Sequence, residues 1–231
     1  MAYKFPKSDD EQYQLLVQMT HSKYYDTYLR FALFPFGSEE KFRDTLMDKI
    51  NFDNYENILD LCCGTGGSTF AIRKKIGEQG SVTGMDLSAG RINIARKKNP
   101  YRNVSFKAGD ARSTGFEDDV YSKIFISFAL HEMPELIRLN ILKEIMRILC
   151  DDGSLIIIEE DNARSFWIRM FLSFWNMNWI PYPINLESNT KKEMLKKGVP
   201  KDLLDAGFKN IVKTELFRGS IQIVIGKKSK E

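Results

Sequence analysis

The chain has 231 residues, of which 43% are hydrophobic and 28% are charged, with 15 glycines and 7 prolines. This composition excludes collagen-like, fibrous and low-complexity disordered proteins, and the length fits one elaborated α/β domain or two small ones. The 34 basic and 31 acidic residues leave a net charge of only +3, so we expect no nucleic-acid partner.

Short apolar runs alternate with segments of helical periodicity through the central part of the chain. The predicted strands span residues 57–62, 81–86, 104–108, 124–128 and 154–158, and the predicted helices between them span residues 68–76, 91–98 and 134–149. Parallel strands need crossover connections, and helices of this size can supply them. The order therefore predicts an α/β fold with a doubly wound, mostly parallel sheet that has helices on both faces.

The helix predicted over residues 134–149 carries apolar side chains that cluster toward one face. They are Leu136, Leu139, Ile141, Leu142, Ile145 and Leu149. Cys150 is followed by Asp151, Asp152 and Gly153, and we expect these three residues to break the helix before the strand at residues 154–158 begins.

Two apolar runs near the C-terminus, residues 211–217 and 221–226, are separated by only three residues. So short a turn requires the two strands to pair antiparallel, as a hairpin. No internal repeat or Pro/Ser-rich linker divides the sequence. We therefore expect one domain over residues 1–231, with a helical N-terminal lid extension at 1–50 and an aromatic, substrate-side insertion at 161–200.

A glycine-rich loop lies between the first predicted strand and the first predicted helix. Backbone N–H groups at such a helix start attract a polar or anionic ligand group, although an ordinary tight turn has the same pattern. Two phosphate-binding motifs do not fit. A dinucleotide fingerprint needs a third glycine three residues after Gly66, where Thr69 stands, and the Gly-Lys-Ser/Thr of a P-loop is absent.

Two carboxylates are predicted to reach the same edge of the sheet. Asp86 closes the second strand, 22 positions after Gly64, where a carboxylate can accept hydrogen bonds from both hydroxyls of a ribose. Asp110 follows the third strand and can accept from an exocyclic amine, with a solvated loop aspartate as the alternative. The pattern favours a ligand that has a ribose without a phosphate.

Four segments, DLCCGTGG, VTGMDLS, AGDAR and ISFALHEMP, resemble the sequential motifs of class I S-adenosylmethionine-dependent methyltransferases in order and spacing. The resemblance covers roughly residues 58–160. It implies a Rossmann-like, seven-stranded, mostly parallel sheet with a C-terminal antiparallel hairpin, and S-adenosyl-L-methionine as the cofactor. The hairpin agrees with the ending predicted from the residues alone.

The resemblance also implies which residues hold the cofactor. Asp60, Gly64 and Gly66 would hold the methionine portion, and Asp86 would hold the ribose. Asp110 and Ala111 would hold the adenine, and Ser127 and Phe128 would face the sulfonium. Cys62 and Leu87 complete the expected contact set. Neither Cys62 nor Cys63 is expected to be a nucleophile, because methyl transfer from a sulfonium needs no covalent enzyme intermediate.

Two aromatic segments lie outside these motifs. Residues 23–36 include Tyr25 and Asp26 and are either a helix packed on the core or an active-site lid. Residues 164–180 hold all three tryptophans, and two of them, Trp167 and Trp175, belong to a broad apolar helical face, which fits core, a lid over a greasy substrate, or a membrane-surface contact. The Tyr-Asp near the N-terminus, together with residues 161–227 and their AGF…G hairpin, resembles the ubiquinone/menaquinone biosynthesis C-methyltransferases. The bacterial phospholipid N-methyltransferases are similar too.

The predicted activity is methyl transfer to a lipophilic small molecule, either a quinone precursor or a lipid amine. For this the protein must exclude water and hold the acceptor in line with the methyl group. A base is needed only when the acceptor must lose a proton, and the candidates are His131, Tyr25 and Asp26. His131 is alternatively a cap of the following helix. Transfer to a soluble metabolite or metalloid, and a non-catalytic cofactor-binding module, are the other hypotheses.

The cysteines and the N-terminal sequence bear on the compartment. Cys62 and Cys63 are adjacent and Cys150 is distant, so neither a disulfide framework nor a metal site is expected, and the predicted location is cytoplasmic. The N-terminal residues lack the apolar core of a signal peptide, and no run of about 18 uncharged apolar residues occurs. Contact with a membrane is therefore expected only at its surface.

Overall fold

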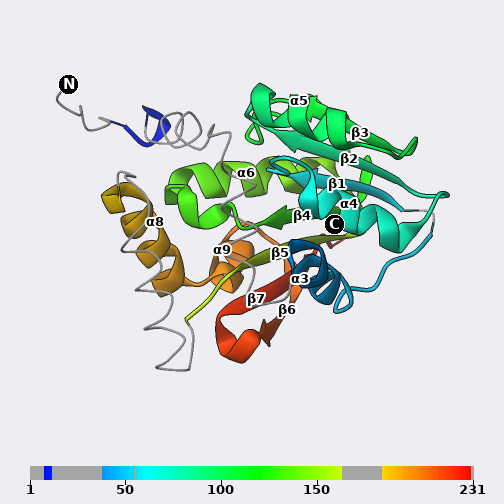
Figure 1. Cartoon of the computed structure of the whole chain (residues 1–231). Coiled ribbons are helices and arrows are strands. Elements are labelled where there is room, and N and C mark those ends of the chain that lie inside the picture. Colours follow the sequence, from blue (N-terminus) through cyan, green and yellow to red (C-terminus); the bar gives the residue numbers. More distant parts are fainter. Residues whose placement is uncertain (1–7, 12–37, 55, 163–183, 230–231) are drawn as a thin grey trace, which may run out of the picture.

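The computed structural model describes residues 8–11, 38–54, 56–162 and 184–229. In these ranges seven strands form one sheet in the order β3-β2-β1-β4-β5-β7-β6 (Figure 1). The strands are β1 (Asn57–Leu61), β2 (Ser81–Asp86), β3 (Val104–Ala108), β4 (Tyr121–Ser127), β5 (Leu149–Glu160), β6 (Lys209–Leu216) and β7 (Ile221–Lys227). Neighbours from β3 to β5 are parallel, whereas β7 pairs antiparallel with both β5 and β6. The predicted sheet and its C-terminal hairpin are confirmed.

Helices cover both faces of the sheet (Figure 1). One face packs against α3 (Glu39–Met47), α4 (Gly67–Ile76) and α5 (Ala89–Lys98), and the other against α6 (Glu135–Ile148), α8 (Ile184–Lys197) and α9 (Val199–Asp205). Two short 3-10 helices, η2 (Leu130–Glu132) and η3 (Phe217–Gly219), follow β4 and β6.

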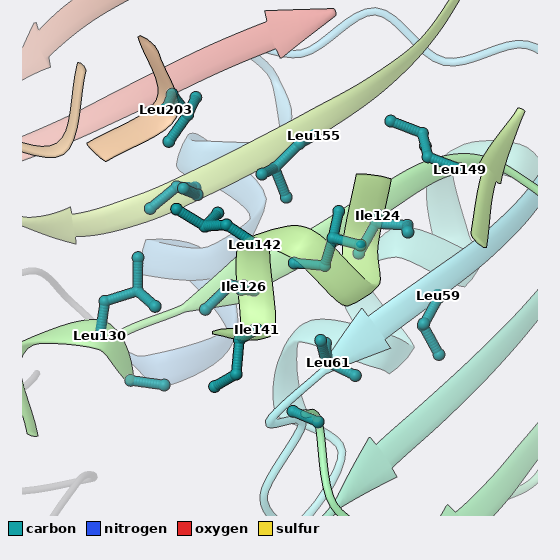
Figure 2. Packing of buried hydrophobic residues seen from close by; sticks show 14 of the residues in the cluster. Leu59, Leu61, Ile124, Ile126, Leu130, Ile141, Leu142, Leu149, Leu155 and Leu203 are labelled. Carbon is teal, nitrogen blue, oxygen red and sulfur yellow. The ribbon is translucent and has the colours of Figure 1, made fainter. Parts of the chain in front are cut away.

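Successive side chains of a strand point to opposite faces of the sheet, so each face has its own hydrophobic core. Leu59 and Leu61 of β1 belong to the cluster that contains Ile141 and Leu142 of α6, and Figure 2 shows these side chains packed together. Ile58, the neighbour of Leu59, belongs to the cluster on the α3 and α4 face. All five side chains are fully buried, and each such burial stabilises the fold by about 1.5–3 kcal/mol. The two cores fix the strand ends that carry the candidate site.

The three residues predicted to separate the helix from the next strand instead lie within that strand. Strand β5 starts at Leu149, so Asp151, Asp152 and Gly153 lie inside it, where its register with β4 shifts. Asp152 has a positive φ of 59°, and a Cβ on Gly153 would come within 2.7 Å of the Cys150 carbonyl oxygen. The turn residues therefore form an irregularity in a long strand, because β4 continues to offer backbone partners on both sides of it.

The N-terminal extension predicted at residues 1–50 contributes α3, and the insertion predicted at residues 161–200 contributes α8. Tyr25, Asp26 and the aromatic segment at residues 164–180 lie outside the described residues. Among the helices that the structure does describe, none is long and apolar enough to cross a membrane.

Candidate cofactor and active site

The candidate site lies where the direction of chain winding reverses. β1 pairs with β2 on one side and with β4 on the other, and all three strands are parallel. In open α/β sheets, ligands bind in the crevice outside the carboxyl ends of the strands at such a point. The loop after β1 and the segment after β4 therefore lie at the same edge of the sheet.

The loop after β1 needs glycine at two positions. Gly64 and Gly66 have positive φ values of 58° and 89°, a region that glycine enters at no steric cost. A Cβ on Gly66 would lie 3.0 Å from the Phe106 ring, whereas a Cβ on Gly64 would meet no atom of the described chain within 4 Å. The open space at Gly64 lets a ligand approach the backbone closely. Cys62 also has a positive φ, of 61°, which is strain at a functional loop.

Asp60 is a fully buried carboxylate beside this loop. Its Oδ2 accepts a hydrogen bond of 2.6 Å from the Thr69 hydroxyl, while its Oδ1 has no hydrogen-bond partner within the described part of the chain. Burial raises the pKa of Asp60 to about 7, although the Thr69 hydrogen bond and the charge of Arg43 act in the opposite direction. A buried acceptor of this kind is costly without a partner. The ammonium group of the methionine portion of S-adenosylmethionine has the chemistry that fits it.

Arg43 of α3 lies beside the candidate site, although the sequence did not indicate it. Its Nη1 donates to the Ser68 hydroxyl at 2.7 Å, and its Nε donates to Glu39 at 2.9 Å. A Cβ on Gly67 would lie 2.7 Å from the guanidinium, so this glycine makes room for it. The Ser68 hydroxyl also lies 2.8 Å from that of Ser127. The arrangement brings a positive charge to the start of α4, and nothing in the sequence places α3 there.

Asp86 is held rigidly at the end of β2. Its Oδ2 accepts the Gly64 N–H at 2.9 Å, and its Oδ1 accepts the Ser88 N–H at 2.8 Å. The Arg91 guanidinium lies 4.0 Å from Oδ2. Each carboxylate oxygen has two lone pairs, so each can accept one further hydrogen bond from a hydroxyl. The structure thus brings the glycine loop and the predicted ribose carboxylate together.

Asp110, predicted to contact adenine, is bound by a guanidinium. The backbone N–H of Arg112 donates to Asp110 Oδ1 at 2.9 Å, and its Nη2 donates to Oδ2 at 2.6 Å. Burial by itself raises the pKa of Asp110, but the bonds and charge of Arg112 hold it below its usual value. Arg112 also pairs with Asp10, and Ala111 is buried. Gly109 donates its N–H to the Asp86 carbonyl, which sets this loop beside the ribose carboxylate.

Ser127 is the last residue of β4, and Phe128 follows it. Phe128 has a positive φ of 52°, and its ring centroid lies 6.0 Å from that of Phe42 in α3. Leu87 and Cys62 pack against the core on the α6 face. Burial raises the pKa of the Cys62 thiol, so it stays protonated at neutral pH.

His131, the first candidate base, lies in η2 immediately after β4. Its Nδ1 is 2.8 Å from Oε1 of the buried Glu159 in β5, a partner that sequence reasoning missed. Burial opposes a charge on the imidazole, but the charge and hydrogen bond of Glu159 raise the pKa of His131 to about 10. The N-cap of α6 is Pro134, which makes no side-chain cap hydrogen bond. Within the described ranges, no group of three or more His, Cys, Asp or Glu side chains is arranged to hold a metal ion.

The sheet order, the glycine loop and the paired carboxylates define a class I methyltransferase fold. The fold is similar to a SAM-dependent methyltransferase from Aquifex aeolicus, with a TM-score of 0.62 and 19% identity over 97% of this chain and 99% of that one. It is also similar to phosphoethanolamine N-methyltransferase 2 of Haemonchus contortus in complex with S-adenosyl-L-methionine, with a TM-score of 0.66 and 13% identity over 93% of this chain and 60% of that one.

The chain belongs to the ubiE/COQ5 methyltransferase family, which it matches over residues 7–228. A demethylmenaquinone methyltransferase of Lactobacillus johnsonii is 29% identical to it over 215 residues, covering 86% of each chain. The chain is therefore a methyltransferase that uses S-adenosyl-L-methionine. The activity class and cofactor expected from the four motifs are confirmed.

Proposed function

We propose that the protein methylates a ring carbon of a lipophilic quinol, the reduced precursor of a quinone that carries an isoprenoid chain. The observation that carries this proposal is the family match over residues 7–228, together with a relative named demethylmenaquinone methyltransferase that aligns over 86% of the chain. The reduced ring is the chemically sensible acceptor, because an electrophilic methyl group requires an electron-rich carbon and a quinone ring is electron-poor.

We assign each of the three carboxylates to a different part of the cofactor. Asp60 binds the ammonium group, because its Oδ1 is buried and lacks a partner within the described residues. Arg43 binds the carboxylate of the same methionine portion from across the start of α4. Asp86 accepts the ribose hydroxyls through the lone pairs that its two backbone hydrogen bonds leave available. Asp110 and Ala111 border the adenine.

The protein's part in the reaction is to position the reactants and exclude water. When bound, S-adenosylmethionine supplies a methyl group already activated by a positively charged sulfur. Gly64 and Gly66 give the loop its close approach, and Ser127 and Phe128 at the end of β4 face the reacting centre. His131 lies on the acceptor side of these residues.

We also propose roles for two segments outside the described residues. We assign Tyr25 and Asp26 to a lid over the acceptor, and residues 164–180 to the apolar surface that holds its chain. Three tryptophans in that one segment favour contact at the lipid–water boundary, where such side chains gather. The protein thus reaches its acceptor by peripheral contact with a membrane surface.

The test is methyl transfer by the full chain from radiolabelled S-adenosylmethionine to a prenylated naphthoquinol in mixed micelles. Three other acceptors are run in parallel: the oxidised quinone, phosphatidylethanolamine, and a water-soluble naphthoquinol without the chain. We expect label in the prenylated quinol, and a product whose proton spectrum shows a methyl group on a ring carbon. Transfer only to the lipid amine, only to soluble acceptors, or to oxygen would refute the proposal.

A pair of variants tests the apolar surface separately. Trp167→Ala should lower transfer to the prenylated quinol while affinity for S-adenosylmethionine is retained, and Trp167→Phe should restore much of the loss. The protein should co-sediment with liposomes, and Trp167→Ala should weaken this. If both variants lose cofactor affinity and stability together, the segment is core.

A further inference from the structure

Side chains from three elements form a short hydrogen-bonded chain beside the glycine loop. Arg43 of α3 donates through Nη1 to the Ser68 hydroxyl oxygen at 2.7 Å, and that oxygen lies 2.8 Å from the hydroxyl oxygen of Ser127 at the end of β4. Ser68 is buried and Ser127 is half-buried. Among the described residues, neither hydroxyl has a further hydrogen-bond partner. The chain therefore begins at a charged donor and ends at the Ser127 hydroxyl.

The direction of the bond between the two serines follows from the groups around it. A guanidinium only donates, whereas a hydroxyl has one proton to give and two lone pairs that accept. If Ser127 donated to Ser68, the Ser68 proton would be buried with no acceptor in the described part of the chain, which is costly. The favourable order is therefore from Arg43 to Ser68 to Ser127. In this order the Ser127 hydroxyl accepts from Ser68, and its own proton can be donated to a ligand.

The backbone at Ser127 is fixed on the side of β5. Ser127 is in register with Ile158, and the next N–H, that of Phe128, donates to the Ile158 carbonyl oxygen at 2.8 Å. The positive φ of Phe128, 52°, breaks the alternation of the strand, so its ring packs against Phe42 of α3, on the same face as the Ser127 hydroxyl. Strained backbone of this kind clusters at functional sites. Ser127 thus presents its proton from a rigid strand end.

The place of Ser127 in the sheet favours the acceptor as the ligand that takes this bond. The residues proposed to bind the methionine, ribose and adenine portions of the cofactor lie at or after the ends of β1, β2 and β3. β4 lies on the other side of β1, next to the methionine portion alone. The sulfur that carries the methyl group belongs to that portion. An acceptor that approaches the methyl group from the side of β4 therefore meets the Ser127 hydroxyl.

We infer that Ser127 donates a hydrogen bond to the ring oxygen that stands beside the methylated carbon of the acceptor, and that Arg43 and Ser68 orient this donor. The inference rests on the proposed function, since it assumes an acceptor with an oxygen at that position. Methyl transfer requires the reacting carbon to lie in line with the methyl group, about 3–3.5 Å away. A bond that holds the neighbouring oxygen selects one ring carbon for this place. Ser127 is then a specificity-determining residue, and Ser68 is a positioning residue.

Two prenylated naphthols that differ only in the place of the hydroxyl test this assignment. The first carries its hydroxyl beside the ring carbon to be methylated, and the second carries it beside the carbon that bears the chain. Their affinities are measured by naphthol fluorescence in mixed micelles, with S-adenosylhomocysteine bound. We expect Ser127→Ala to weaken binding of the first naphthol about five- to tenfold, as loss of one hydrogen bond does, and to leave the second unchanged. Ser127→Thr, which keeps a hydroxyl, should keep most of the affinity.

Three controls separate this role from a general effect on the fold. Ser122→Ala removes a hydroxyl from the opposite end of the same strand, where it donates to the Asn57 carbonyl oxygen at 3.1 Å, and should change neither affinity. Ser68→Ala should give a smaller loss, again for the first naphthol only, because Ser127 keeps its proton but loses the group that orients it. Affinity for S-adenosylhomocysteine, measured by calorimetry, should be the same in Ser127→Ala as in the wild type, which also shows that the variant folds.

Three results would overturn the inference. An equal loss for the two naphthols would mean that Ser127 does not distinguish the two oxygens, and no loss for either would mean that it binds neither. Weaker binding of S-adenosylhomocysteine by Ser127→Ala, with the naphthols unaffected, would assign the proton to the carboxylate of the cofactor.

The proposed function fails in a different way. A wild-type protein that methylates the prenylated quinol but gives any of these three results refutes the role of Ser127 alone. A wild-type protein that transfers no methyl group to the quinol refutes the proposed acceptor, and with it the oxygen assigned to Ser127.

Discussion

Binding of S-adenosylmethionine should become tighter as the pH rises from 6 to 7.5, because the proposed partner of its ammonium group is Asp60. Burial raises the pKa of this carboxyl to about 7, so near pH 6 most of the protein carries it protonated. A protonated carboxyl attracts an ammonium only weakly. Binding of the cation should therefore displace the proton, and affinity should follow the ionised fraction of Asp60.

The size of the effect follows from that pKa. If only the ionised form binds, the competent fraction rises from about a tenth at pH 6.0 to about three quarters at pH 7.5, so Kd falls about eightfold, or about 1.2 kcal/mol. The window ends near pH 7.5 because an α-amino group, whose pKa is about 8, loses most of its proton above that pH. His131 keeps its charge throughout this range and does not contribute.

Isothermal titration calorimetry in two buffers of different ionisation enthalpy measures both the affinity and the protons released. We expect release of about 0.9 proton per cofactor bound at pH 6.0, since that is the fraction of Asp60 protonated there. S-adenosylhomocysteine has the same ammonium and should show the same trend. Asp60→Asn keeps an acceptor for Thr69 but should bind weakly and without pH dependence. Equal affinity of the wild type at pH 6.0 and 7.5, or an unchanged trend in Asp60→Asn, would refute the reasoning.

Three further predictions concern other parts of the site. Asp86→Asn should weaken cofactor binding by about 1.5–3 kcal/mol and also lower stability, because it removes a charge that holds two backbone N–H groups; unchanged affinity by calorimetry in a folded variant would contradict the ribose assignment. The double variant Cys62→Ala, Cys63→Ala should retain methyl transfer, because burial keeps both thiols protonated, and complete loss in a variant that still binds cofactor would point to thiol chemistry. The unfolding free energy should fall as pH rises from 6.5 to 10, because the folded state keeps the proton of His131 that the unfolded state loses; His131→Gln should flatten that slope in denaturant titrations.

The sheet was predictable because its signals are local. Apolar runs and glycine turns predicted a position for each of the seven strands without tertiary information, and the short C-terminal turn predicted the antiparallel pair. The inner face of α6 was predicted less well. Leu136 is 56% exposed, whereas Arg138, one turn from the apolar residues, is fully buried. The partner that makes this burial possible is Asp202, whose Oδ2 lies 2.9 Å from Arg138 Nε and which is 64 positions away, so no periodicity could indicate it.

The site shows the same division between local and distant information. The positions of Asp60, Asp86 and Asp110 were predictable because each lies at or near the carboxyl end of a strand, and the carboxyl ends of parallel strands meet at one edge of the sheet. Their partners from other parts of the fold were not.

Arg43 reaches the glycine loop only because α3 packs on α4, and Glu159 meets His131 only because β5 lies beside β4. These partners decide the chemistry. Sequence position alone made His131 a candidate base, but the Glu159 carboxylate beside it outweighs the opposing effect of burial and raises the pKa of the imidazole to about 10. Thr69 is a second example. In the sequence it counted against a dinucleotide-binding motif, because that motif needs a glycine at this position. In the structure its hydroxyl donates a hydrogen bond to Asp60.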